Sequence, residues 1–151
     1  MRTDDERLFP TQTLTDVAEH NAFGRLGEDE AALYLTSIGY TLLERNWRHG
    51  HEEIDLIADD FGEVVFVEVK TRRSERLATA LGDVDRFKQM HLMSAAYAYL
   101  SRYDVRPAFR FDVVTIVGEQ PPYHLKHYVN VFTPWGIEAW RREHHAFPRK
   151  K

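Results

Sequence analysis

The order of apolar and polar residues along the chain predicts two helices and at least four strands. Between Arg25 and Ile38, apolar residues recur at steps of three and four, which is the period of a helix with one buried face, and Gly39 is a natural stop. Residues 84–102 repeat this period, and core packing is the expected role of their apolar side. That side comprises Phe87, Met90, Met93, Tyr97 and Leu100.

Segments with the character of strands lie between and after these helices. Short runs of branched and aromatic residues, separated by turn-forming residues, are typical of strands. A helix, a three-stranded meander, a second helix and a further strand favour an α/β domain in which a mixed sheet is flanked by helices. Residues 1–21 show no sustained period, so we expect a loose N-terminal extension there. The predicted strands are residues 41–48, 52–58, 63–71 and 109–117, with a short fifth one near residues 127–132.

Composition narrows the class of protein. With 151 residues, 43% of them hydrophobic, the chain is long enough for one domain with a core. A charged fraction of 29% and a mean hydropathy of -0.50 indicate a soluble protein, and no apolar run is long enough to span a membrane. Cysteine is absent, and the acidic N-terminal residues are unlike a secretory signal, so we expect a cytoplasmic protein without disulfides.

Charge is unevenly distributed along the chain. The net charge of -4 argues against a protein that coats DNA, and charge alone favours a mixed, solvated surface. Carboxylates gathered around a cation would, however, lower the net charge without excluding a polyanionic substrate. Basic residues follow the third predicted strand, at Arg72, Arg73, Arg76, Arg86 and Lys88.

Three charged residues interrupt the second and third predicted strands, which are otherwise apolar. If Phe61 and Gly62 form a two-residue turn, Asp55 lies opposite Glu68, with about 5 Å between their Cβ atoms. Lys70 then projects from the same face of the sheet, two residues further along. This shared face depends on the turn, because a slip of one residue would send Asp55 to the opposite side.

A further charged residue, Glu28, falls in the middle of the apolar stripe of the first helix. Two close carboxylates, such as the strand pair, repel each other unless one is protonated or a cation lies between them. Mg²⁺ suits such oxygen ligands, and a lysine beside it suits a reaction that builds negative charge at phosphorus. Metal-assisted phosphodiester hydrolysis is therefore a reaction class in which all of these groups would have a role. The alternative is a solvated strand edge with cross-strand ion pairs, which is the usual context of Glu-x-Lys.

An ordered series of motifs adds a family resemblance. The chain carries GRLGEDEAALYLTSIGYTLLERNWR, followed by EIDLIADD, VVFVEVKTR, a lysine-bearing helix and RFDVVTI. Over residues 22–132 it closely resembles the YraN-like family of uncharacterised bacterial proteins. That family is similar in turn to archaeal Holliday junction resolvases and to the PD-(D/E)xK, or restriction-endonuclease-like, superfamily. The resemblance implies an αβββαβ core and Mg²⁺-dependent cleavage of DNA, and it leaves residues 133–151 as a C-terminal tail.

The same resemblance implies roles for individual residues. Asp55 corresponds to the metal-binding aspartate, Glu68 and Lys70 to the E-x-K pair, and Glu28 to the glutamate of the first helix. The three acidic residues are then expected to hold Mg²⁺ or Mn²⁺, with the lysine acting on the attacking water or the transition state. One departure is Glu52, where the family usually has glycine, and this leaves the local backbone geometry open. The expected phosphate contacts are Arg72, Arg73, Arg76 and Lys88.

Other residues allow more than one interpretation. His49 and His51 flank a glycine in a predicted turn, and they suit either a zinc pair or contacts with phosphate. Asp112 suits either a supporting position near the metal or an ion pair with an arginine.

Two functions remain open beside the nuclease. The same fold can serve as a nucleic-acid-binding module without catalysis, or as a structural interaction domain, which the acidic net charge favours. For the nuclease, the resemblance makes branched or junction DNA in repair or recombination the expected substrate. Because resolvases of the wider superfamily work as dimers, it also makes a homodimer one expected state.

Overall fold

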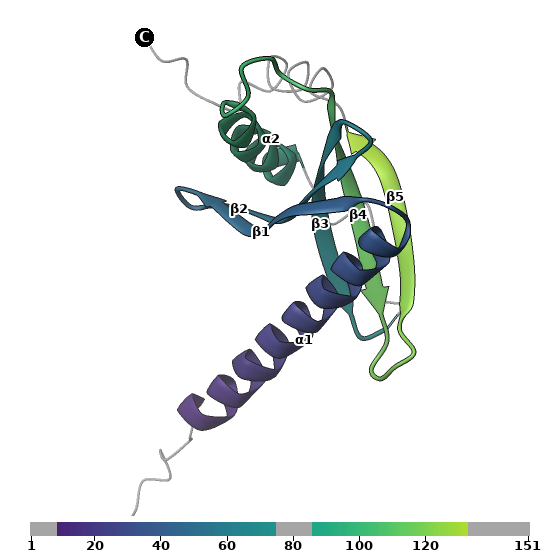
Figure 1. The fold of residues 1–151 in the computed structure, drawn as a ribbon. Coiled ribbons are helices and arrows are strands. Elements are labelled where there is room, and N and C mark those ends of the chain that lie inside the picture. Colours follow the sequence, from purple (N-terminus) through teal and green to yellow (C-terminus); the bar gives the residue numbers. More distant parts are fainter. Residues whose placement is uncertain (1–8, 75–85, 133–151) are drawn as a thin grey trace, which may run out of the picture.

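The computed structural model describes residues 9–74 and 86–132. Two helices and five strands follow one another along the chain (Figure 1). Their bounds are α1 Phe9–Ser37, β1 Thr41–His49, β2 Glu52–Asp60, β3 Glu63–Arg72, α2 Arg86–Leu100, β4 Phe109–Val117 and β5 His124–Phe132.

The five strands form one mixed sheet in the order β1-β2-β3-β4-β5. β1, β2 and β3 are an antiparallel meander, β4 runs parallel to β3, and β5 returns antiparallel to β4. The parallel pair requires a crossover, which contains α2. The predicted α/β class with an αβββαβ core is therefore confirmed, and β5 extends the sheet.

Each helix covers one face of the sheet. Along β3, alternate residues point to opposite faces because the side-chain period of a strand is two. Val64 and Phe66 pack with α2, in a cluster that includes Met90, Met93 and Tyr99. On the other face, α1 contributes Ala31, Ala32 and Leu35 to a cluster with Leu56, Val65, Val67, Val114 and Ile116. The two faces of β3 are thus the ones that the sequence predicts.

The turn between β2 and β3 sets the register of the hairpin. Phe61 and Gly62 have φ angles of 48° and 95°, and both central residues of a tight hairpin turn of this kind need positive φ. Asp60 pairs with Glu63, as predicted, and the pairing continues to Leu56 opposite Val67. The predicted register is therefore confirmed over this part of the hairpin.

Beyond Leu56 the two strands separate into a fork. The backbone N–H of Val69 donates to Oδ2 of Asp55 at 2.8 Å, so this side chain takes the place of a strand partner. On β1, Asn46 has a positive φ of 49°, which interrupts the regular strand close to the same point. The tip of the β1–β2 hairpin accordingly points away from β3 (Figure 1). We call this opening between β2 and β3 the strand fork.

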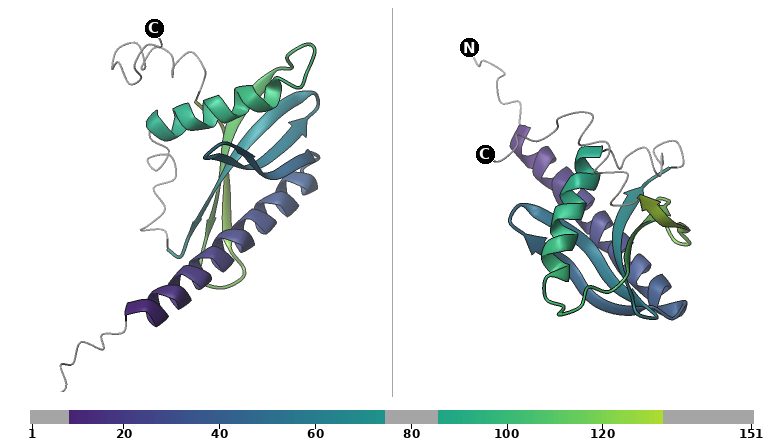
Figure 2. Two further views of the ribbon diagram at one scale, coloured as in Figure 1. Left: turned by 90° about the vertical axis from the view of Figure 1, so that its left-hand side faces the viewer. Right: turned by 90° about the horizontal axis from the view of Figure 1, so that it is seen from above.

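The ends of the helices differ from the sequence-based expectation. α1 begins at Phe9 rather than at Arg25, and its N-terminal half projects beyond the sheet (Figures 1 and 2). Residues 9–21, expected as a loose extension, thus form helix, while the domain boundary at residue 21 stays a prediction. Two residues expected to be buried are exposed, Ile38 at 43% and Phe87 at 55%. Ile38 lies beyond the end of α1, and Phe87 lies in the first turn of α2.

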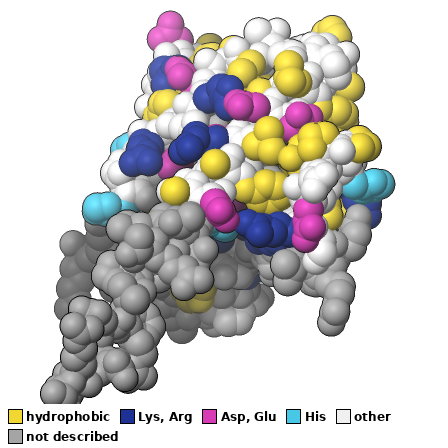
Figure 3. Space-filling view, turned by 90° about the horizontal axis from the view of Figure 1, so that it is seen from below, with side chains coloured by type: hydrophobic (Ala, Val, Ile, Leu, Met, Phe, Trp, Pro, Cys, Tyr) yellow, Lys and Arg dark blue, Asp and Glu magenta, His cyan; other side chains and the backbone are white. Residues whose placement is uncertain are grey.

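The surface carries both signs of charge. On the face shown in Figure 3, Lys and Arg side chains are interspersed with Asp and Glu side chains, and hydrophobic side chains lie between them. Within the described parts of the chain, neither helix is long and apolar enough to cross a membrane.

Candidate active site

The strand fork brings two acidic side chains from neighbouring strands together. Asp55 projects from β2 where the strands separate, and its carboxylate bonds to the backbone of β3. Glu68 belongs to β3 and is 8% exposed. The two carboxylates interact strongly enough that the charge of Glu68 raises the pKa of Asp55. The two side chains are therefore close, as expected, but they are not the directly opposed pair that the register predicts, because strand pairing ends at Leu56 and Val67.

Two lysines approach Glu68 from different elements. Nζ of Lys70, two residues along β3, lies 3.7 Å from Oε1 of Glu68. Nζ of Lys88, in the first turn of α2, lies 3.7 Å from the same oxygen. The second oxygen, Oε2, is buried and has no hydrogen-bond partner among the described residues. Glu68 therefore keeps one acceptor atom that the described residues do not satisfy, which is uncommon for a buried polar group.

The pKa of Asp55 is raised to about 8. Burial is the main cause, and the negative charges of Glu68 and Glu28 add to it. The N–H of Val69 and the ammonium of Lys88 act in the opposite direction but do not offset it. At neutral pH, Asp55 is therefore mostly protonated unless a positive charge joins the site.

Glu28 approaches the fork from the other face of the sheet. At Gly27, the residue before Glu28, α1 lies so close to β3 that an added Cβ would collide with Cγ2 of Thr71. This close approach holds Glu28 near the end of the fork, where burial raises its pKa and a hydrogen bond with Asn46 lowers it. The structure places Glu28 within electrostatic range of Asp55, with its own partner on β1.

The chemistry of these groups fits a divalent cation. A cation would satisfy the free oxygen of Glu68 and favour the ionised form of Asp55, and oxygen ligands suit Mg²⁺ and Mn²⁺. Among residues 9–74 and 86–132, however, no three His, Cys, Asp or Glu side chains are already arranged around a common centre. The assignment of Glu28, Asp55 and Glu68 as ligands stays a prediction.

The predicted phosphate contacts are spread over two places. Lys88 lies at the strand fork, whereas Arg72 and Arg73 lie at the far end of β3. Nη1 of Arg72 donates to the carbonyl of Thr71 at 2.8 Å, and the guanidinium of Arg73 lies 6.0 Å from the ring centre of Phe23. Arg76 lies outside the described residues. Of the described members of this set, Lys88 is paired with Glu68 at the strand fork.

The histidines of the β1–β2 turn lie beside the site. The ring of His49 stacks on Trp47 at 6.2 Å between ring centres, and His51 is exposed. They form no zinc group with a third ligand within the part of the chain that the structure describes. His91 of α2, which the sequence analysis did not single out, has its Nδ1 3.3 Å from Oε1 of Glu52. The sequence offers one signal for His91: it lies three residues after Lys88 in a predicted helix, and residues at this spacing are neighbours on the helix surface.

Asp112 forms an ion pair with an arginine, which is the second of the two roles expected for it. It accepts hydrogen bonds from Arg110 and from His127, and it is 1% exposed. His127 was missed by the sequence analysis because the pairing of β5 with β4 creates this contact.

These observations define an α/β protein with a buried, incompletely compensated carboxylate pair and two lysines at a fork in a mixed sheet. Comparison with known proteins then identifies its family. The model of the uncharacterised protein family UPF0102 matches residues 27–116, and the chain belongs to this family. The resemblance to the YraN-like family is thereby confirmed.

Three relatives illustrate this membership. The UPF0102 protein of Phocaeicola vulgatus is 39% identical over 118 residues, covering 78% of this chain and 98% of the relative. That of Chlorobium phaeobacteroides is 41% identical over 116 residues, covering 72% and 92%. That of Oleidesulfovibrio alaskensis is 45% identical over 102 residues, covering 66% of this chain and 50% of the relative.

Proposed function

We propose that this protein is a metal-dependent endonuclease that hydrolyses phosphodiester bonds of DNA. The observation that carries the proposal is Glu68, a buried carboxylate with one unpartnered oxygen, beside Asp55 and between two lysines. A buried carboxyl whose pKa is strongly raised beside a second carboxylate, as at Asp55, is a candidate for a functional site. Branched or junction DNA is the substrate that the family resemblance favours.

In this function the carboxylates and the lysines have separate tasks. Asp55 and Glu68, assisted by Glu28, hold Mg²⁺ or Mn²⁺, which when bound polarises the phosphoryl group and acidifies water. Lys70 donates a hydrogen bond to the attacking water or to the phosphoryl oxygen as negative charge develops. Lys88 contacts a phosphate of the strand from α2, which makes DNA binding weaken with salt. The largely buried surroundings of Glu68 and Lys70 strengthen their interactions.

Cleavage of defined DNA substrates tests the proposal. Purified protein is incubated with four-way junction, flap, single-stranded and duplex DNA in Mg²⁺, Mn²⁺ or EDTA. We expect cleavage of at least one structured substrate with a divalent cation, and none in EDTA. Asp55→Asn and Lys70→Met are expected to lower the rate by about 10²–10³-fold, because each removes a group that stabilises developing charge.

Matched variants separate a real site from a contaminant. Asp104→Asn in an exposed loop and Lys126→Met on an exposed position of β5 make the same chemical changes away from the fork. Both are expected to cleave like the wild type. Equal activity of Asp55→Asn and wild type would assign the cleavage to another protein or another site. DNA binding without any cleavage would instead favour the non-catalytic binding module.

A further inference from the structure

A pocket lies beside the strand fork, between the tip of the β1–β2 hairpin and α2. Its volume is about 710 Å³, which is within the range of small-molecule sites. Lys88 lines this pocket and also pairs with Glu68, so the pocket and the candidate active site share one side chain. A nucleotide whose phosphate lies at Lys88 can therefore extend into the pocket.

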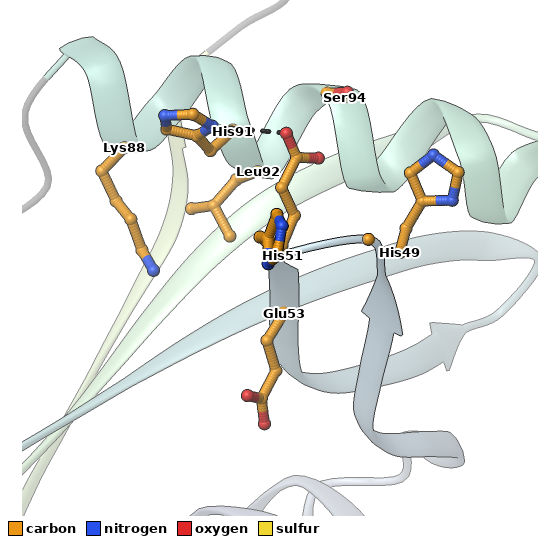
Figure 4. A pocket seen from close by; sticks show the side chains of 9 residues that line it. His49, His51, Glu53, Lys88, His91, Leu92 and Ser94 are labelled. Atoms are coloured by element: carbon orange, nitrogen blue, oxygen red, sulfur yellow. Dashed lines mark hydrogen bonds and ion pairs between the residues drawn. The ribbon is translucent and has the colours of Figure 1, made fainter.

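The pocket contains a carboxylate with a free acceptor. Oε1 of Glu52 accepts from Nδ1 of His91 at 3.3 Å, and the dashed line in Figure 4 marks this contact. Oε2 of Glu52 is buried and has no hydrogen-bond partner among the described residues. Leaving such an oxygen unsatisfied costs free energy, and an N–H group of a ligand would recover it.

The remaining walls suit a flat, aromatic ligand. His49 and His51 come from the hairpin tip, and His91 faces them from α2 with Leu92 beside it (Figure 4). The exposed imidazole rings of His51 and His91 offer stacking surfaces to a nucleobase. Glu53 points away from these rings and pairs with Arg48 at 3.3 Å, so Glu52 is the carboxylate that faces the ligand.

We propose that this pocket binds the base of an unpaired nucleotide and that Oε2 of Glu52 accepts a hydrogen bond from its exocyclic amino group. The inference takes its substrate class, DNA, from the proposed function. Guanine, adenine and cytosine carry an exocyclic amino group. Thymine has none, and its N3–H lies between two carbonyl oxygens, which a carboxylate repels. The pocket thus favours amino-bearing bases over thymine, and DNA with an unpaired nucleotide over a continuous duplex.

DNA-binding measurements without metal test this pocket separately from catalysis. Fluorescence anisotropy in EDTA at fixed salt compares two duplexes that differ in one bulged base, cytosine or thymine. We expect the wild type to bind the cytosine bulge about fivefold more tightly, and the fully paired duplex more weakly than either. Glu52→Gln, whose amide can also donate to thymine, is expected to bring the ratio of the two bulges to about one.

A second variant controls for the chemical change itself. Glu44→Gln removes the same charge from β1, where Glu44 meets Arg102 at 3.7 Å, and it is expected to keep the cytosine preference. Thermal unfolding of both variants verifies that they are folded.

The outcomes distinguish the pocket from the nuclease. Equal binding of the two bulges by the wild type, or a preference retained in Glu52→Gln, overturns the base pocket and leaves the proposed nuclease standing. Base-dependent binding without metal-dependent cleavage supports the pocket and overturns the nuclease. Absence of binding to every DNA overturns both.

Discussion

Two buried carboxylate centres on the same sheet have opposite surroundings. Asp112 on β4 accepts from Nε of Arg110 at 3.0 Å, from Nε2 of His127 at 2.7 Å and from the backbone N–H of Asn130 at 2.9 Å. Glu68 on β3 lies 3.7 Å from each of two lysines, and among residues 9–74 and 86–132 its second oxygen has no hydrogen-bond partner.

The pKa values of the two centres shift in opposite directions. Burial disfavours the ionised form of Asp112, yet the hydrogen bonds from His127 and Arg110 hold its pKa below the ordinary value. Burial also disfavours ionised Asp55, but there the charge of Glu68 adds to the effect and the pKa rises to about 8. Burial raises the pKa at both centres, and the hydrogen-bond partners and neighbouring charges decide the direction of the net shift.

The difference distinguishes a structural role from a functional one. Around Asp112, Arg110 also reaches Asp60 at 2.9 Å and the hydroxyl of Tyr40 at 2.6 Å, so the network joins α1's end, β2 and β4. Such a network holds elements together, and both carboxylate oxygens of Asp112 already have donors in it. At the strand fork, compensation is incomplete, and this is the basis of the proposed cation site.

Removing Asp112 is the change with the largest expected effect on stability. Asp112→Ala leaves the guanidinium of Arg110 and the imidazole of His127 buried without their main acceptor. We expect the free energy of unfolding to fall by about 3–5 kcal/mol, as measured by urea denaturation. Asp104→Ala, at an exposed loop position, is expected to change it by less than about 0.5 kcal/mol. Similar values for the two variants would show that the network around Asp112 does not stabilise the fold.

Asp55→Asn is expected to change stability in the opposite direction. The raised pKa means that the folded protein binds a proton at Asp55 that the unfolded chain has released, between about pH 4 and pH 8. Stability of the metal-free wild type therefore falls as the pH rises through this range. Asn keeps an oxygen for Val69 N–H and cannot ionise, so the variant is expected to be more stable at pH 8 by on the order of 1–2 kcal/mol.

Urea denaturation at several pH values measures this effect. The wild type and Asp55→Asn should converge near pH 4 and diverge towards pH 8. Asp104→Asn is the matched control and should follow the wild type throughout. A wild type that gains stability between pH 5 and pH 8 relative to Asp55→Asn would show that Asp55 is compensated in the metal-free protein.

A divalent cation is expected to have the smallest of these effects. At pH 8, Mg²⁺ at several times its dissociation constant should stabilise the wild type by about 1 kcal/mol, because it binds the folded state alone. The gain should shrink at pH 6, where protonated Asp55 competes with the cation, and it should be lost in Asp55→Asn. Differential scanning calorimetry with Ca²⁺ and K⁺ as comparison ions measures it. An equal gain for Asp55→Asn would place the cation elsewhere.

Much of the fold follows from local patterns in the sequence. Phe61 and Gly62 form a tight turn that sets the register of β2 and β3, and alternation then assigns the faces of β3. The start of α1 and the exposure of Phe87 were not predicted. α1 begins in a segment that lies beyond the sheet and shows no sustained helical period. The exposure of Phe87 depends on how far the sheet extends beneath α2, which periodicity alone does not contain.

From the sequence alone, turn type and strand period predict that Glu68 and Lys70 share a face of β3 and that Asp55 comes close to them, because both are local properties of the chain. The direct pairing of Asp55 with Glu68 is not formed, because the pairing of β2 with β3 ends at Leu56 and Val67. Tertiary packing settles the rest of the site. It opened the strand fork, brought Lys88 over from α2, and placed Glu28 through the contact of Gly27 with Thr71. These contacts join elements that are distant in the sequence, and the packing of both helices on the sheet sets them.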